Sequence, residues 1–175
     1  MNDTLGKYLL RKRIEKVVPH IRGKLVDIGC GTNELCAAYG KDAVGVDVYP
    51  WPGVDQVVTN TADLPFKSKS IDTVTIIAAL NHIPNRNEVL KEAHRILNDN
   101  GRLIITMIPP FISTVWHTLR KPWDVDQSER GMKEGEVYGL SPAAIRKLIN
   151  ENGFEVKEEH PFMLGVNRLY VALKK

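Results

Sequence analysis

The amino-acid sequence predicts an α/β fold, a doubly wound and mostly parallel sheet with a C-terminal antiparallel hairpin. Short, nearly continuous apolar runs, typical of strands buried on both faces, alternate with segments of helical periodicity. The final segment, residues 154–175, has the pattern of two strands joined through Gly-Val-Asn. The four apolar runs are KLVDIG at 24–29, DAVGVDVYP at 42–50, IDTVTIIAAL at 71–80 and GRLIITMI at 101–108.

Length and composition favour a single domain over residues 1–175. The chain has 24 basic and 21 acidic residues, too even a balance to indicate a nucleic-acid binder by itself. Cys30 and Cys36 form no C-x-x-C motif, which favours free thiols in a reducing compartment. No apolar run has the length of a membrane span, and the first residues lack the features of a signal peptide. We therefore expect a cytoplasmic protein.

The first 22 residues predict an amphipathic helix that ends or bends at Pro19. Its apolar face has the spacing of one helix side, and we expect the basic residues opposite to form a solvated face. A nucleic-acid or membrane contact is the alternative for that face. The apolar residues are Leu10, Ile14, Val17 and Ile21, and the basic ones are Lys7, Arg11, Lys12, Arg13 and Lys16.

Two later segments also predict helices. One begins at Asn85, which together with Glu88 resembles a capping box, and is expected to end at Gly101. The other begins at Ser141, a capping residue followed by proline, and ends at Gly153. Residues 120–139 fit neither a helix nor a strand, and loops of that length in a compact domain tend to be functional or disordered.

The stretch VDIGCGTNEL, at 26–35, is a strand that ends in Gly-x-Gly before a helix start, a turn that favours ligand binding. A dinucleotide fingerprint would need a third glycine where this chain has Glu34, and a carboxylate there is unfavourable beside a pyrophosphate. Asp47, at the end of the next apolar run, suits hydrogen bonds from ribose hydroxyls. A nucleoside without a pyrophosphate fits both observations.

Six motifs together resemble the class I S-adenosylmethionine-dependent methyltransferases, and most closely their type-11 small-molecule branch. They cover residues 24–172 apart from the loop at 111–139, and they are VDIGCGTN, VGVDV, ADLPF, IDTVTIIAALNHIPN, EVLKEAHRILNDNGRLIIT and LSPAAIRKLINENGFEV. The resemblance implies S-adenosyl-L-methionine as cofactor and a small organic acceptor. It also implies a set of cofactor contacts: Asp27, Gly29, Cys30, Gly31, Asp47, Val48, Ala62, Asp63, Leu64 and Ala79.

Three features depart from the family pattern. Asn33 stands where a third glycine is common, and asparagine tolerates the left-handed conformation such a turn requires. The link YPWPGVD after the second predicted strand has no room for the usual helix, and the helix before that strand is also short. We therefore expect a shortened second-strand region with an open adenine side, where Trp51 either covers the cofactor or simply packs in its turn.

His82 and Asn81, which follow the fourth strand of the family fold, are the candidate catalytic residues. Histidine side chains in general titrate near 6.5 and suit removal of a proton, although a structural role for His82 that ties its loop to the next helix is the alternative. His117 and His160 are further candidates, and a surface role is expected for His160. His94 is expected on the polar side of its helix.

Residues 111–139 are expected to form a substrate lid. Its candidate substrate contacts are Trp116, Arg120, Trp123 and Tyr138, although a solvated loop with anchoring tryptophans is the alternative. A calcium loop at Asp124 is excluded because Glu129 stands where glycine is needed and Gly135 where glutamate is needed, and no metal is expected. Two functional alternatives stay open: an RNA or protein methyltransferase that docks through the basic helix, and a cofactor-binding module without turnover.

Overall fold

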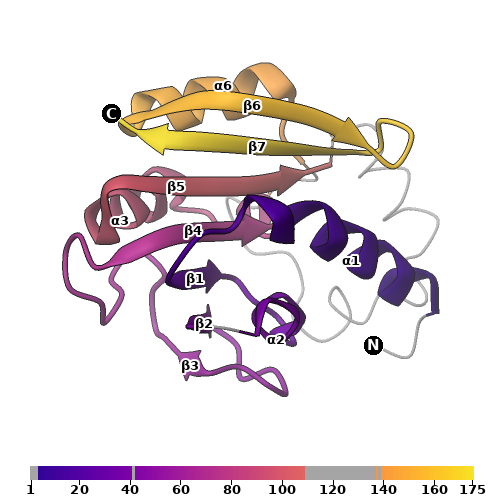
Figure 1. Ribbon diagram of the computed structural model, residues 1–175, viewed down its shortest axis with the longest axis horizontal. Coiled ribbons are helices and arrows are strands. Elements are labelled where there is room, and N and C mark those ends of the chain that lie inside the picture. Colours follow the sequence, from indigo (N-terminus) through magenta and orange to yellow (C-terminus); the bar gives the residue numbers. More distant parts are fainter. Residues whose placement is uncertain (1–3, 41, 109–136, 138) are drawn as a thin grey trace.

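The computed structural model describes residues 4–40, 42–108, 137 and 139–175. These residues contain a seven-stranded sheet in the order β3-β2-β1-β4-β5-β7-β6, shown in Figure 1. The five strands β3, β2, β1, β4 and β5 run parallel to one another, and β7 is antiparallel to both of its neighbours. This order confirms the predicted doubly wound sheet with its terminal hairpin. The strands are β1 Leu25–Ile28, β2 Ala43–Asp47, β3 Gln56–Val57, β4 Ile71–Ile77, β5 Leu97–Met107, β6 Phe154–Phe162 and β7 Asn167–Lys174.

Helices cover both faces of the sheet (Figure 1). On one face, α3 Arg86–Ile96 and α6 Pro142–Glu151 contribute to the larger apolar cluster, which includes Val26 and Ile105. On the other, α1 Thr4–Val17 and α2 Glu34–Tyr39 share a second cluster with Leu25 and Ile104. Because successive strand residues point to opposite faces, neighbouring residues of β1 and of β5 belong to different clusters.

The sequence predicted most helix ends correctly. The first helix ends at Val17, and Pro19 lies in the short 3-10 helix η1 Val18–His20 that follows. The Ser141 hydroxyl accepts a hydrogen bond from the Ala144 N–H at 3.2 Å, and α6 ends just before Gly153. Asn85 is the N-cap of α3, but its side chain makes no capping hydrogen bond. The expected capping box is therefore wrong in its side-chain contacts.

Gly101 does not end α3, contrary to the sequence prediction. The helix ends at Ile96 and the chain enters β5 at once, because Leu97 already pairs with Ile71 of β4. Gly101 lies buried within β5, where an added Cβ would lie 2.8 Å from Leu97 Cδ2. Here the glycine permits close packing inside a strand rather than a helix stop.

The region after β2 is short, as the sequence predicted. Residues 48–55 contain no helix, β3 has two residues, and α2 has six. In this turn the rings of Tyr49 and Trp51 lie 4.4 Å apart between their centroids. No helix in the described residues is long and apolar enough to cross a membrane.

Candidate functional site

The Gly-x-Gly turn follows β1 at the carboxyl edge of the parallel strands. The N–H groups of Gly29 and Cys30 both donate to the Val46 carbonyl, at 2.8 and 3.1 Å. Both glycines have positive φ, +72° for Gly29 and +55° for Gly31. A Cβ on Gly29 would lie 2.7 Å from Ala79 Cβ, whereas one on Gly31 would meet nothing within 4 Å. The turn therefore packs closely on one side and leaves open space over Gly31.

Asp47 lies buried at the end of β2, beside this turn. Its Oδ2 accepts from the Gly31 N–H and its Oδ1 from the Tyr49 N–H, each at 3.0 Å. These two bonds fix the carboxylate at the edge of the sheet where the sequence placed a ribose contact. Val48, the predicted adenine contact, is 40% exposed.

Asn33 adopts the left-handed conformation, with φ +61°, and so takes the place of a third glycine as predicted. Its Nδ2 donates to the Gly53 carbonyl at 2.9 Å and to Asp55 Oδ2 at 2.8 Å. The same Oδ2 accepts from the Gly45 N–H of β2 at 2.8 Å. The side chain thus ties the glycine turn to the shortened region after β2, a role the sequence did not indicate.

Asp27, the last polar residue of β1, is 3% exposed and accepts a hydrogen bond from Thr75 Oγ1 at 2.6 Å. Burial raises the pKa of Asp27 to about 7; the Thr75 bond opposes this rise, and the charge of Asp47 adds to it. A substantial fraction of this carboxyl is therefore protonated near neutral pH, in contrast to an ordinary aspartate.

An Asp27→Asn variant is expected to change the pH dependence of stability. A folded-state pKa raised above the unfolded value of about 3.9 means that the folded chain binds more protons, so stability falls as pH rises from about 4 to 7. The slope from this one group approaches about 1.4 kcal/mol per pH unit. Urea unfolding between pH 4 and 8 should show a flatter profile for the variant. An equal slope in the variant would contradict the assignment, and exposed Asp42→Asn is the control.

Residues 62–64, the predicted adenine contacts, lie in a loop anchored by α3. Asp63 is exposed, and its side chain is therefore accessible. The Ala62 N–H already donates to Asn60 Oδ1, and the Leu64 N–H donates to Glu92 Oε1 at 2.8 Å. Contacts from these three residues to a cofactor remain a prediction.

Glu92 and Arg95 hold this loop, and the sequence analysis did not predict a role for either residue. Glu92 is 7% exposed, and Arg95 contacts both of its carboxylate oxygens, at 2.6 and 2.8 Å. Arg95 also donates to the Leu64 carbonyl at 3.2 Å. Burial opposes ionisation of Glu92, but the bonds from Arg95 and Leu64 outweigh it and lower its pKa. The i,i+3 spacing of this pair on a helix was the available signal.

Ala79 and the candidate catalytic residues follow β4. Ala79 precedes the short 3-10 helix η2 Leu80–His82 and accepts from the His82 N–H at 2.9 Å. Asn81 is buried, and its Nδ2 donates to the Val137 carbonyl at 3.3 Å while its own carbonyl accepts from the Val137 N–H at 3.0 Å. His82 is half-buried. The Asn81 amide thus has a structural partner, and catalytic roles for both residues remain predictions.

The remaining candidates have mixed outcomes. Trp116, Arg120, Trp123, Tyr138 and His117 lie outside the described residues, as does most of the expected lid. His94 is not simply on a polar face, because its ring packs edge-on against Phe154 with centroids 5.3 Å apart. Cys30 and Cys36 are free thiols, as predicted, and burial raises the pKa of Cys36 to about 12.

A pocket of about 690 Å³ lies between α1, the end of β5 and the β6–β7 turn. Its walls are largely apolar and include Leu9, Ile108 and Phe162. Two polar side chains line it without a hydrogen-bond partner among the described residues: Arg13, through its buried Nε, and Asn167, through both amide atoms. Burial lowers the pKa of Arg13 to about 10. The expectation that Arg13 lies on a solvated face is therefore wrong.

Comparison with known proteins gives consistent matches. A demethylmenaquinone methyltransferase of Thermotoga maritima is 23% identical, over 93% of this chain and 83% of its own length. The ubiquinone/menaquinone biosynthesis C-methyltransferase UbiE of Burkholderia mallei (strain SAVP1) is 28% identical, over 99% and 86%. Among solved structures, an S-adenosylmethionine-dependent methyltransferase from Thermotoga maritima has a TM-score of 0.71 at 20% identity, over 93% of this chain and 88% of that one. One from Mesorhizobium loti has a TM-score of 0.68 at 15% identity, over 93% and 96%.

The family model described as a methyltransferase domain matches residues 4–159, which is most of the chain. The matched range includes the glycine turn, the Asp47 strand end and the loop held by α3, and the solved structures share the overall fold. The chain therefore belongs to the methyltransferase-domain family and is an S-adenosylmethionine-dependent methyltransferase.

Proposed function

We propose that this enzyme methylates a small, largely apolar organic acceptor that carries an anionic or polar group. The observation that carries the proposal is the apolar pocket beneath α1, with Arg13 and Asn167 as polar groups without partners in the described structure. Pockets with apolar walls and a few convergent polar groups are typical of small-molecule sites. The names of the curated relatives, which refer to demethylmenaquinone and to quinone biosynthesis, also support a small organic acceptor.

The pocket lies at the same edge of the sheet as the glycine turn. Gly29 and Ala79 follow the carboxyl ends of β1 and β4, and Ile108 follows that of β5, the next strand. Asn167 begins antiparallel β7, whose next residue, Arg168, pairs with Met107. In open α/β sheets ligands bind outside this edge, which supports an acceptor in the pocket together with a cofactor at the turn.

Two side chains with buried, unpartnered polar atoms, Arg13 through its Nε and Asn167 through its amide, define the proposed chemistry of the acceptor. Arg13 keeps its charge at neutral pH, since its pKa of about 10 is well above 7. A guanidinium removed from water is costly unless an anion or an acceptor oxygen pairs with it. The fully buried Asn167 amide offers both a donor and an acceptor. A carboxylate or an ionised hydroxyl on an apolar ring satisfies both groups.

The residues at the turn fit the cofactor. The open space over Gly31 leaves room for its methionine end, and Asp47 retains acceptor capacity on both oxygens for ribose hydroxyls. The Asp47 carboxylate, together with Asp27 when that group is ionised, gives the region negative character, which favours a sulfonium. Asp63, whose side chain is exposed on the anchored loop, is the proposed acceptor for the adenine amino group.

S-adenosylmethionine supplies an activated methyl group when bound, so the protein's task is orientation and, for some acceptors, proton removal. Arg13 and Asn167 hold the polar end of the acceptor, and the apolar walls exclude water. Orientation of this kind supplies roughly 7–11 kcal/mol of barrier lowering. His82 is proposed as the base for acceptors that lose a proton, and Asn81 as the residue that fixes the turn carrying it through its bonds to Val137.

Turnover with matched acceptors tests the proposal. The probes are hydroxylated naphthalene carboxylates and their neutral amides, with transfer of a radiolabelled methyl group as the readout. Arg13→Met is expected to raise KM for the carboxylates at least about tenfold, with a smaller change in kcat and little change for the amides, because a charge-assisted contact is lost.

Charge reversal at Lys7 and Arg11 is the matched control, because both basic side chains are exposed on α1 and neither lines the pocket. Small-molecule turnover should be unchanged by it. Methylation of RNA that disappears in this control variant, with no turnover of any small acceptor, would instead establish a macromolecular substrate. Equal losses for carboxylates and amides in Arg13→Met would remove the assigned role of Arg13.

A further inference from the structure

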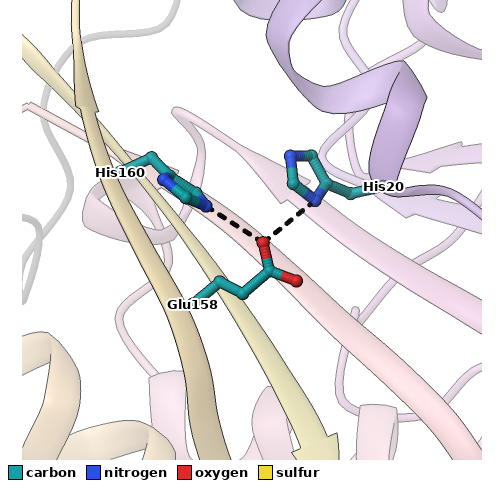
Figure 2. Close-up of side chains that lie close together, drawn as sticks. All are labelled: His20, Glu158 and His160. Atoms are coloured by element: carbon teal, nitrogen blue, oxygen red, sulfur yellow. Dashed lines mark hydrogen bonds and ion pairs between the residues drawn. The ribbon is translucent and has the colours of Figure 1, made fainter.

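We propose that His20, Glu158 and His160 form a binding site for a divalent transition metal, with Zn²⁺ as the expected ion. His20 belongs to η1, and the other two residues belong to β6. Figure 2 shows the two imidazole rings directing a nitrogen toward the same carboxylate oxygen. The site uses none of the residues assigned to the cofactor or the acceptor.

The distances suit one ion. His160 Nε2 lies 3.0 Å and His20 Nδ1 lies 3.6 Å from Glu158 Oε2, and one ligand atom from each residue lies within 4.8 Å of the others. Zinc–ligand bonds of about 2.0–2.2 Å in tetrahedral geometry place ligand atoms about 3.3–3.5 Å apart. Two of the three separations already bracket this value, and a modest rotation of the His20 or His160 ring closes the third.

A β-bulge puts both β6 ligands on the correct face. Val156 pairs with Ala172 and Glu158 with Val171, so Lys157 is an extra residue in the ladder. Val171 and Leu169, opposite Glu158 and His160, belong to the apolar cluster beneath α1, and η1 follows α1. Without the extra residue the alternation would turn Glu158 and His160 to the α6 face, away from His20.

The donor set selects the class of ion. Two imidazoles and one carboxylate are typical ligands of zinc and its neighbours in the transition series, whereas calcium and magnesium prefer oxygen alone. The side chains of Glu158 and His160 are 45% and 41% exposed, which leaves room for a water or another ligand at the fourth position.

Nearby positive charge limits the affinity. Arg102 Nη1 donates to the His20 carbonyl at 3.0 Å, and Lys16 also brings positive charge close to the His20 ring. Glu158 offsets this repulsion. We therefore expect micromolar rather than picomolar binding, and we expect the ion to fix η1, and α1 before it, against β6.

Titration of the untagged full-length chain with ZnCl2 at pH 7.5, followed by calorimetry, tests the site. One equivalent should bind with a micromolar dissociation constant and raise the thermal midpoint. His160→Gln and Glu158→Gln, which preserve size, should each weaken binding at least about tenfold. His94→Gln, at a described histidine outside the cluster, is the matched control and should leave the affinity unchanged.

Cobalt substitution distinguishes this site from the thiols of Cys30 and Cys36. Co²⁺ at the proposed site should give visible bands without sulfur-to-metal charge transfer. Three results would each overturn the proposal. They are no binding at zinc concentrations up to about 100 times the expected micromolar dissociation constant, full affinity in both Gln variants, and a strong sulfur-to-cobalt charge-transfer band. Far-UV circular dichroism of each variant confirms that a loss of binding is not a loss of fold.

Discussion

A Gly45→Ala variant is expected to bind S-adenosylhomocysteine at least about tenfold more weakly than the wild-type chain and to lose about 1–3 kcal/mol of stability. The added Cβ would overlap Asn33 Oδ1 and lie 2.9 Å from Cys30 Sγ. Because Asn33 is held by Gly53 and Asp55, it cannot move away without releasing the glycine turn. Titration calorimetry and urea unfolding measure the two effects.

Asn33→Gly provides the decisive comparison for this prediction. Glycine adopts the left-handed conformation of this position freely and has no side chain to overlap an alanine at 45. Asn33→Gly alone should lose about 1 kcal/mol of stability through its missing hydrogen bonds. The double variant, Asn33→Gly with Gly45→Ala, should recover most of the cofactor affinity lost in Gly45→Ala. Additive losses in the double variant would show that the clash lies elsewhere.

Arg95→Met is expected to destabilise the chain by about 1–3 kcal/mol. It should also speed amide hydrogen exchange in the loop at 62–66. The substitution leaves the Leu64 N–H as the remaining partner of the buried Glu92 carboxylate among the described residues. It also removes the Arg95 hydrogen bond to the Leu64 carbonyl. Urea unfolding and amide hydrogen exchange provide the measurements.

Acid pH and two further variants test the origin of this loss. Because Arg95 lowers the pKa of Glu92, the stability it contributes is present above the ordinary pKa of about 4.3 and is lost as pH falls through the lower folded-state value. The difference from wild type should therefore shrink below about pH 4. Adding Glu92→Gln should reduce the penalty, since no buried charge then remains unpaired. Arg146→Met, which breaks an exposed pair with Glu159, should cost less than about 1 kcal/mol; an equal cost would refute the assigned role.

The sheet and most helices could be predicted because their signals are local. Apolar runs, glycines and caps such as Ser141 determine the conformation of residues close to them in the sequence. Because the carboxyl ends of parallel strands meet at one edge of the sheet, Gly29 and Asp47 then lie at the same edge. The fate of Gly101 could not be predicted this way. Leu97 pairs with a distant strand, and that pairing ends α3 five residues before the usual helix-stop signal would act.

Side chains that depend on long-range register were also beyond prediction. Arg13 carries a charge at a position that lines the pocket, and a polarity pattern assigns such a residue to solvent. His20 and His160 meet only because of the extra residue at Lys157, which no periodicity reveals. The surface role expected for His160 follows from local sequence, whereas its contact with His20 follows from how β6 pairs with β7.

The bulge at Lys157 also affects how the enzyme meets other copies of itself. Strand β6 is one border of the sheet, and its backbone is a template on which a foreign strand could add. The irregular step at Lys157, the charged pair it forms with Glu155, and Pro161 all interrupt that template. At the opposite border, β3 extends over two residues. We therefore expect that self-association at high concentration proceeds through helical surfaces and not through continuation of the sheet.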